Sequence, residues 1–273
     1  METIEGKTAF ITGGARGIGL GIARAFHAAG ARVAVADVDA DALALAKAAL
    51  AGGPTVETVV LDVRDRDAYA RAADQVEARL GPVSLLFNNA GVAGFAPITR
   101  LTYAAWDWVL DINVGGVVNG IQTFLPRMLA RGGDGHIVNT ASGAGLAATP
   151  SGMLYTTSKF AVVGLSEALR IELQPFAIGV SVLCPGPVRT RIIDNTLASR
   201  PADALAETTP EEAAIQDAAM RQASVFLESG TPPERVGEMV LAGVKSNQLY
   251  IHTDRIMEQP IKARAEALLA ALP

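Results

Sequence analysis

The chain alternates short runs of apolar, often β-branched residues with longer segments of helical character. Runs of this kind are typical of strands that are buried on both faces of a parallel sheet. The segments between them have the lengths of right-handed crossovers. The pattern therefore predicts an α/β fold, a doubly wound, seven-stranded parallel sheet with helices on both faces. The expected strands are Lys7–Thr12, Arg32–Asp37, Val56–Asp62, Leu85–Asn88, His136–Thr140, Val180–Cys184 and Leu249–His252.

We expect one domain over residues 1–273, because no linker or internal repeat interrupts this alternation. The segment of about residues 188–233, from Val188 to Pro233, is too long for a simple connection and contains many Pro, Ala, Glu and Asp residues. Segments of this size in compact domains are often lids over a binding site. The alternative is a solvated surface insertion.

Composition excludes several classes of protein. No segment combines the length and apolar character of a membrane span, and the acidic start, Met1 to Glu5, lacks the layout of a signal peptide, so we expect a cytoplasmic protein. The net charge of −5, with no basic stripe, argues against nucleic acid as a partner. The single Cys184 is expected to be a small buried residue, and the three scattered histidines predict no metal site.

A glycine-rich turn, from Thr12 to Gly19, ends the first predicted strand and precedes the helical run Leu20–Ala29. Gly13 would allow the tight turn, Gly17 a close approach of the backbone to a pyrophosphate, and Gly19 close packing of the helix. The helix N-terminus would add amide donors and positive potential. The spacing departs from the G-x-G-x-x-G fingerprint, so the assignment rests on the strand before it and the helix after it. In that context the turn predicts a Rossmann-type dinucleotide site.

Asp37 closes the second predicted strand, where a carboxylate can accept both ribose hydroxyls and repel a 2′-phosphate. This residue favours NAD as the cofactor, although it could instead be a strand-end cap. Arg16, inside the glycine turn, could pair with the 2′-phosphate of NADP, or it could be solvated or lie near the pyrophosphate.

Tyr155 and Lys159 are four residues apart in a segment expected to be helical, so the Lys159 ammonium can lie near the Tyr155 phenol. A phenol has a pKa of about 10, and a pKa near 7 requires roughly 4 kcal/mol of preference for the phenolate. A nearby cation can supply part of that preference. The pair therefore predicts a proton donor and acceptor, unless the spacing is a coincidence on a surface helix.

Six motifs occur in order along the chain: Thr12-Gly-x-x-x-Gly-Ile-Gly19, Asn88-Asn-Ala-Gly91, Asn113, Ser142, Tyr155-x-x-x-Lys159 and Pro185-Gly186. With them the sequence resembles the single-domain short-chain dehydrogenases/reductases from about Lys7 to Thr190. The resemblance implies the strand order 3-2-1-4-5-6-7 and nicotinamide-dependent hydride transfer. It also implies that Asp62 and the Val63 amide meet the adenine and that Thr190 binds the nicotinamide carboxamide. The full expected cofactor set is Gly13, Arg16, Gly17, Ile18, Gly19, Asp37, Asp62, Val63, Asn89, Tyr155, Lys159, Pro185, Gly186, Val188 and Thr190.

The same resemblance implies a catalytic set of Asn113, Ser142, Tyr155 and Lys159. Ser142 would polarise the substrate carbonyl or steady the alcohol, and Tyr155 would exchange the proton. Lys159 would lower the Tyr155 pKa and bind the nicotinamide ribose. Asn113 would hold a water that links Lys159 to solvent, or it could be a core amide bonded to local backbone.

The residues expected around the substrate are apolar: Phe95, Leu146, Met153, Leu154 and Pro187. No obvious cation lies among them, and the nearest arginines, Arg189 and Arg191, could pair with acidic lid residues. An uncharged, hydrophobic or aromatic secondary alcohol is therefore favoured over a hydroxy acid or sugar phosphate. The segments Asp65–Arg71 and Phe124–Met128 resemble bacterial family members that oxidise benzylic alcohols of lignin-derived aryl ethers.

The sequence thus predicts an NAD-dependent oxidoreductase for a small-molecule alcohol or ketone. One alternative is an NADPH-dependent ketone reductase, and another is a dinucleotide-binding sensor or scaffold without turnover. An epimerase or dehydratase fits less well, because such enzymes usually have a larger substrate domain. The helices expected at Trp106–Met128 and Tyr155–Phe176 have apolar residues around much of their circumference, which predicts a homo-oligomer, a tetramer or a dimer. The last helical segment, Gln259–Leu269, departs from the family's usual glycine-rich ending.

Overall fold

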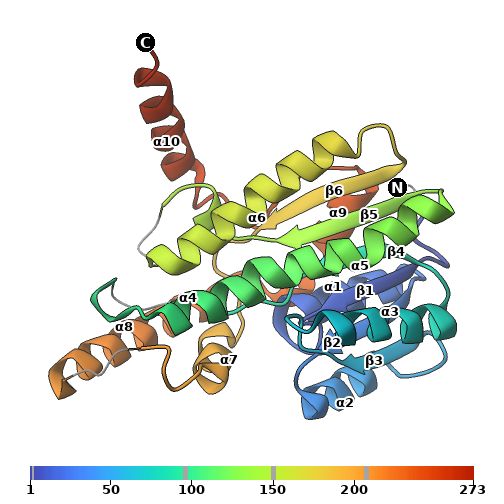
Figure 1. The fold of residues 1–273 in the computed structure, drawn as a ribbon, viewed down its shortest axis with the longest axis horizontal. Coiled ribbons are helices and arrows are strands. Elements are labelled where there is room, and N and C mark those ends of the chain that lie inside the picture. Colours follow the sequence, from blue (N-terminus) through green and yellow to red (C-terminus); the bar gives the residue numbers. More distant parts are fainter. Residues whose placement is uncertain (2, 95–97, 149–151, 206–208) are drawn as a thin grey trace.

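A parallel seven-stranded sheet forms the centre of the computed structural model, which describes residues 1, 3–94, 98–148, 152–205 and 209–273. Its strand order is β3-β2-β1-β4-β5-β6-β7 (Figure 1). This is the predicted doubly wound order, which confirms the fold class. The strands are β1 Thr8–Thr12, β2 Arg32–Asp37, β3 Val56–Val60, β4 Val83–Asn88, β5 Gly135–Thr140, β6 Ile178–Cys184 and β7 Tyr250–His252.

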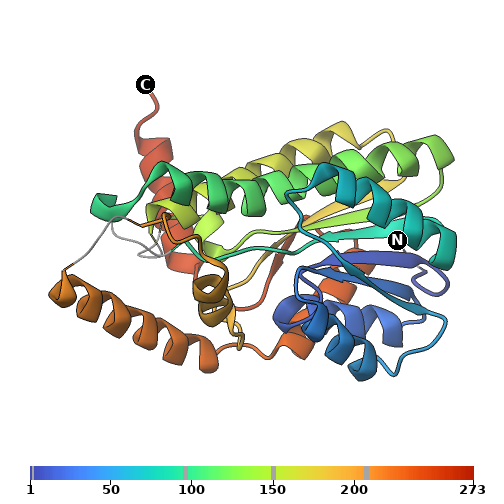
Figure 2. The ribbon, with the colours of Figure 1, turned by 60° about the horizontal axis from the view of Figure 1, so that its bottom comes forward.

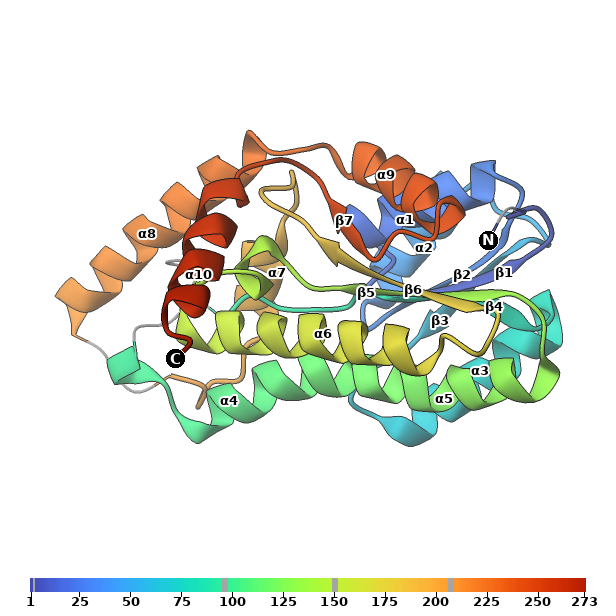
Figure 3. The same cartoon turned by 90° about the horizontal axis from the view of Figure 1, so that it is seen from above.

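Helices cover both faces of the sheet (Figure 3). Every residue of β1 and β5 is buried, as expected for strands packed on both sides. Helices α1 (Gly17–Ala28), α2 (Ala40–Ala49) and α9 (Pro233–Lys245) share one hydrophobic core with the sheet. Helices α3 (Arg66–Leu80), α5 (Gly116–Arg131) and α6 (Met153–Glu172) share the other. The right-handed crossovers thus bury both sheet faces and leave the carboxyl ends of the strands for a ligand.

One predicted helix is in fact two helices. Where the sequence predicts a continuous helix from Trp106 to Met128, α4 (Tyr103–Leu110) and α5 are joined by a π-helical turn, Asp111–Gly115. Gly116 begins α5 in close contact with Val63, since a Cβ there would lie 2.7 Å from a Val63 methyl. π-Turns inside helices are frequent at functional sites, and this one contains Asn113.

The long segment after β6 folds into α7 (Ile192–Ser199) and α8 (Pro210–Glu228). Figure 2 shows both helices on the side of the molecule where the strands have their carboxyl ends. Parallel pairing of Val188 with Thr231 brings the two ends of the segment together. The segment is thus a largely helical excursion whose two ends lie together, with Thr190 beside Gly17 of the glycine turn.

The last helix, α10 (Glu258–Ala270), projects away from the sheet (Figure 1). None of its residues is buried, so the apolar stripe expected for this segment is not covered by a core among the described residues. Cys184 is buried at the end of β6, as predicted, and burial raises the pKa of its thiol to about 12. No helix in the described ranges is long and apolar enough to cross a membrane.

Candidate active site

The glycine turn packs tightly against the end of β4. Gly13 and Gly17 have φ angles of 59° and 51°, a region that side chains other than glycine rarely adopt. A Cβ on Gly19 would lie 2.2 Å from the Gly13 carbonyl oxygen, and one on Gly13 would lie 2.8 Å from the Ala90 Cα. The turn therefore leaves the backbone and the N-terminus of α1 bare, the arrangement that binds a pyrophosphate.

Thr12 and Asn89 hold this turn in place. The Thr12 hydroxyl accepts hydrogen bonds from the backbone amides of Asn89 and Ala90, at 3.0 and 3.1 Å. The Asn89 side-chain amide donates to the carbonyls of Thr12 and Gly13, at 3.0 and 3.2 Å. Asn89, predicted as a cofactor residue, thus acts on the turn itself, and the role of the Thr12 hydroxyl was not foreseen from the sequence.

The Asp37 carboxylate lies at the end of β2 beside the glycine turn. Its oxygens accept hydrogen bonds from the amides of Ala15 and Asp39, each at 3.3 Å. Burial raises the pKa of Asp37, and the amide hydrogen bonds and the Arg16 charge oppose that rise. Arg16 is ion-paired with the Asp39 carboxylate and not with Asp37. The Asp37 carboxylate is thus placed to bind a ribose, while the neighbouring Arg16 guanidinium pairs with Asp39.

The other cofactor residues expected from the resemblance line the same edge of the sheet. Asp62 is paired with the Arg64 guanidinium through both carboxylate oxygens, while the Val63 side chain is buried. Thr190 faces the glycine turn, because a Cβ on Gly17 would lie 3.0 Å from its methyl group. Val188 is buried. The bare turn, the Asp37 carboxylate and this edge together fit a dinucleotide.

The segment after β7 also reaches this site, which the sequence did not indicate. The Gly186 amide donates to the Thr253 hydroxyl at 3.0 Å, and a Cβ on Gly186 would lie 2.2 Å from an Asp254 oxygen. Met257 packs on Gly143, where a Cβ would lie 2.6 Å from its Cγ. No local motif in the segment could have revealed these long-range contacts.

Tyr155 and Lys159 lie one turn apart near the start of α6. The Lys159 Nζ is 5.6 Å from the centre of the Tyr155 ring and donates to the Thr140 carbonyl at 3.1 Å. Burial lowers the Lys159 pKa to about 8. Burial also raises the pKa of Tyr155, and a hydrogen bond with the Ser142 side chain lowers it. In this arrangement the rise caused by burial of the phenol is the largest effect on the Tyr155 pKa, and the Lys159 ammonium lies over the ring.

Asn113 is fixed by the loop that follows β4. Its side-chain oxygen accepts from the Val92 amide at 2.8 Å, and its side-chain nitrogen donates to the Val92 carbonyl and the Ser158 hydroxyl, both at 3.0 Å. A Cβ on Gly91 would lie 3.2 Å from the Asn113 oxygen and 3.4 Å from the Lys159 Nζ. Asn113 and Lys159 thus converge on one glycine, as expected of residues that act together.

Ser142 lies two residues after β5 and caps the 3-10 turn Gly143–Gly145, where its hydroxyl accepts from the Ala144 amide at 3.2 Å. Its side chain also lowers the pKa of Tyr155, the residue that the sequence had paired with it only by family pattern. The four predicted catalytic side chains therefore come from the β5 end, the π-turn and α6, and they meet at the carboxyl edge of the sheet.

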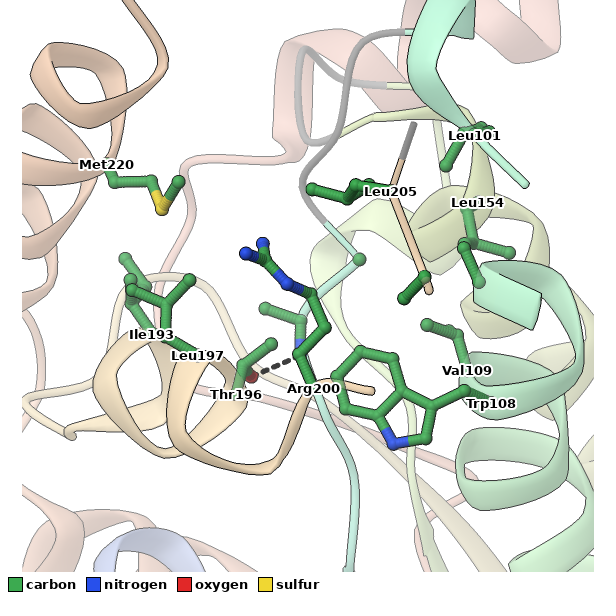
Figure 4. Close-up of a pocket in the computed structure, with 14 residues that line it drawn as sticks. Leu101, Trp108, Val109, Leu154, Ile193, Thr196, Leu197, Arg200, Leu205 and Met220 are labelled. Carbon is green, nitrogen blue, oxygen red and sulfur yellow. Dashed lines mark hydrogen bonds between the residues drawn. The ribbon is translucent and has the colours of Figure 1, made fainter. Parts of the chain in front are cut away.

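An apolar pocket lies beside the backbone of Tyr155 and encloses about 420 Å³ of space, open mouth included. Gly94 and Leu154, which both line it, lie next to Tyr155: a Cβ on Gly94 would be 3.1 Å from the Tyr155 nitrogen. Figure 4 shows its walls, which come from α4, α6, α7, α8 and the loop after β4. The segment 188–233 supplies Ile193, Thr196, Leu197, Arg200, Ala204, Leu205 and Met220.

The predicted substrate residues are only partly found here. Leu154 lines the pocket, whereas Leu146, Met153 and Pro187 do not. Phe95 lies outside the described residues. The sequence pointed to no obvious cation among the expected substrate residues, whereas Arg200 lines this pocket. It was missed because the sequence drew attention to Arg189 and Arg191, which precede α7.

Comparison with known proteins supports the same picture. The family model described as short chain dehydrogenase matches residues 7–201. The C alpha-dehydrogenase of Sphingobium sp. (strain NBRC 103272 / SYK-6) is 42% identical over 253 residues, which cover 92% of this chain and 81% of that protein.

Two solved structures are similar over nearly the whole chain. A short chain dehydrogenase/reductase from Burkholderia phymatum, in complex with NAD, has a TM-score of 0.92 and 35% identity, and the match covers 100% of this chain and 98% of that one. The apo form of LigD from Sphingobium sp. strain SYK-6 has a TM-score of 0.78 and 36% identity, and the match covers 99% of each chain.

Proposed function

Because this chain belongs to the short-chain dehydrogenase family and is an oxidoreductase, we propose that it oxidises a hydrophobic or aromatic secondary alcohol to the ketone, reversibly, with NAD. The observation that supports the proposal is that Tyr155 lies beside Lys159, with Ser142 lowering its pKa and an apolar pocket against its backbone. The name of the Sphingobium relative also places its reaction at a Cα carbon.

The site's own residues account for the proton and for positioning. Ser142 holds the substrate oxygen within reach of the Tyr155 hydroxyl, which takes the alcohol proton in oxidation and returns it in reduction. The buried Lys159 ammonium supplies positive charge near the phenol as negative charge develops there. When bound, the nicotinamide ring would supply the acceptor for the hydride from the carbinol carbon.

The choice of NAD rests on Asp37 and Arg16. A 2′-phosphate would meet the partly buried Asp37 carboxylate, which already uses its oxygens on two amides. Arg16, the cation that would favour NADP, is held by Asp39. Titration of the protein with NADH and NADPH tests this choice, and equal or tighter binding of NADPH would favour the ketone reductase alternative.

Tyr155→Phe tests the chemistry, because it removes only the hydroxyl. We expect turnover of 1-phenylethanol-type alcohols to fall by ~10²- to 10⁴-fold while NAD affinity changes little. Tyr103→Phe is the matched control, because Tyr103 is highly exposed at the start of α4. Near-native turnover in Tyr155→Phe would rule out the assigned role. A wild-type protein that binds NAD but oxidises none of a panel of secondary alcohols would favour the sensor or scaffold.

A further inference from the structure

Arg200 directs its guanidinium into the apolar pocket. It follows the last residue of α7, and in Figure 4 its side chain reaches between Leu205 and Met220 above the face of α7. The side chain is partly buried. Within the described part of the chain it makes no hydrogen bond and no ion pair.

The two arginines that precede α7 are satisfied in other ways. Arg191 pairs with Asp194 at 2.9 Å, and Arg189 donates to the Glu228 carbonyl at 3.0 Å. The polar Thr196 in the pocket is also engaged, since its hydroxyl accepts from the Ala93 amide at 2.9 Å. Arg200 is therefore the pocket's unpaired charged group among the residues described.

A guanidinium in such a place favours an anionic partner. It stays charged at any working pH, and a cation removed from water without a counter-charge is costly. A carboxylate matches its planar fork with two parallel hydrogen bonds. The rest of the lining is made of Trp108, Val109, Ile193 and other apolar side chains, which would bury an apolar body.

The two ends of the pocket are chemically different. At one end Gly94 and Leu154 lie against the Tyr155 backbone, so this end of the pocket is the one beside the candidate catalytic tyrosine. At the other end, Arg200 faces α8 through Met220. A ligand that satisfies both ends has a carbinol at one end, an apolar middle and an anion at the other.

We propose that Arg200 binds a carboxylate at the far end of the substrate, so that the preferred substrate is an apolar, aromatic secondary alcohol that carries an acid group remote from the carbinol. This inference rests on the proposed function and narrows it, because the substrate expected from the sequence was uncharged. Arg200 selects the substrate, while Tyr155 and Ser142 react with its other end.

The kinetic test compares 4-(1-hydroxyethyl)benzoate with its methyl ester, which has the same carbinol and no charge. In the wild type we expect kcat/KM to be ~10- to 100-fold higher for the acid, a ratio typical of a charge-assisted hydrogen bond. Arg200→Met should bring the acid-to-ester ratio close to one, mainly through KM for the acid. Arg200→Lys should restore part of the ratio. Arg191→Met, the same change on an exposed arginine at the start of α7, should keep the wild-type ratio.

A binding test separates this inference from the proposed function, because it needs no turnover. Calorimetry with 4-ethylbenzoate, which has no carbinol, should give a Kd ~10- to 100-fold weaker for Arg200→Met than for the wild type. If neither alcohol is oxidised but this difference persists, the proposed reaction fails and the carboxylate site stands. An acid-to-ester ratio of one or less in the wild type, or equal 4-ethylbenzoate affinity in wild type and Arg200→Met, would overturn the inference.

Discussion

Replacement of His136 by Gln should flatten the acid side of the protein's stability profile. His136 is fully buried in β5, and its Nε2 lies 2.8 Å from the Ser181 hydroxyl. Since that hydroxyl donates its own hydrogen to the Gln248 carbonyl, the imidazole must donate from Nε2. The other ring nitrogen, Nδ1, is buried without a hydrogen-bond partner and packs against Gly179. A proton added there would have no acceptor among the described residues.

The size of the effect follows from the pKa. Burial lowers the His136 pKa from 6.5 to about 3. Between these values the unfolded chain binds a proton that the folded protein does not bind. The stability associated with neutral His136 is therefore fully present above pH 6.5 and is lost as the pH falls toward 3. The loss is about 2 kcal/mol at pH 5 and roughly 5 kcal/mol when His136 is fully protonated.

Denaturant unfolding at several pH values between 4 and 8 would measure this loss as a change in the free energy of unfolding. A Gln at position 136 keeps a donor for Ser181 but cannot take up a proton, so the wild-type curve should fall below that of His136→Gln as the pH drops. His252→Gln, at an exposed position on β7, is the matched control and should follow the wild type. Parallel curves for wild type and His136→Gln from pH 7 to pH 5 would refute the reasoning.

Two other predictions concern the cofactor site and assembly. Gly19→Ala should weaken NAD binding by at least ~10-fold, because its Cβ would lie 2.2 Å from a carbonyl oxygen of the turn. Gly164→Ala is the control, because a Cβ there meets nothing within 4 Å. Equal NAD affinity in the two variants would contradict the packing argument. We also predict a homo-oligomer, a tetramer or a dimer, that forms through the outer faces of α5 and α6, where Val118 and Ile171 are exposed. A sedimentation measurement that shows only monomer at micromolar concentration would exclude this assembly.

The fold was predictable because each buried strand leaves a local signal. A strand covered on both faces is rich in apolar and β-branched residues, so the bounds predicted for β2, Arg32–Asp37, are those of the structure, and the β5 prediction missed only Gly135. The π-turn at Asn113 had no comparable signal. It depends on the match between α4, α5 and the loop after β4, and apolar periodicity does not distinguish a π-turn from a continuous helix.

The sequence could predict which residues form the candidate catalytic set, but not the electrostatic interactions among them. Spacing places Lys159 one helical turn from Tyr155, and the structure agrees. The pKa of the phenol depends in addition on how deeply both side chains are buried and on where the ammonium points. Here the ammonium lies over the ring and donates to the Thr140 carbonyl. The spacing rule includes neither the burial of the two side chains nor the direction of the ammonium. It therefore predicted that Lys159 lies near Tyr155 but not that the Tyr155 pKa is raised.

The specificity proposed for the site depends on which arginine of the segment 188–233 is paired with a carboxylate, and this follows from packing between distant parts of the chain. Arg191 and Arg200 lie at the two ends of the same short helix, and the sequence alone makes both of them plausible lid cations. Arg191 has Asp194 three residues later, on the same side of the helix, and is neutralised there. Arg200 follows the last turn with an extended backbone, at ψ 129°, and its side chain reaches a part of the pocket where the described lining residues from α4 and α8 include no carboxylate. In the proposed site, the charge that selects the substrate is the one that the described acidic residues of the segment 188–233 do not pair with, and its position depends on how α7 and α8 pack over the pocket.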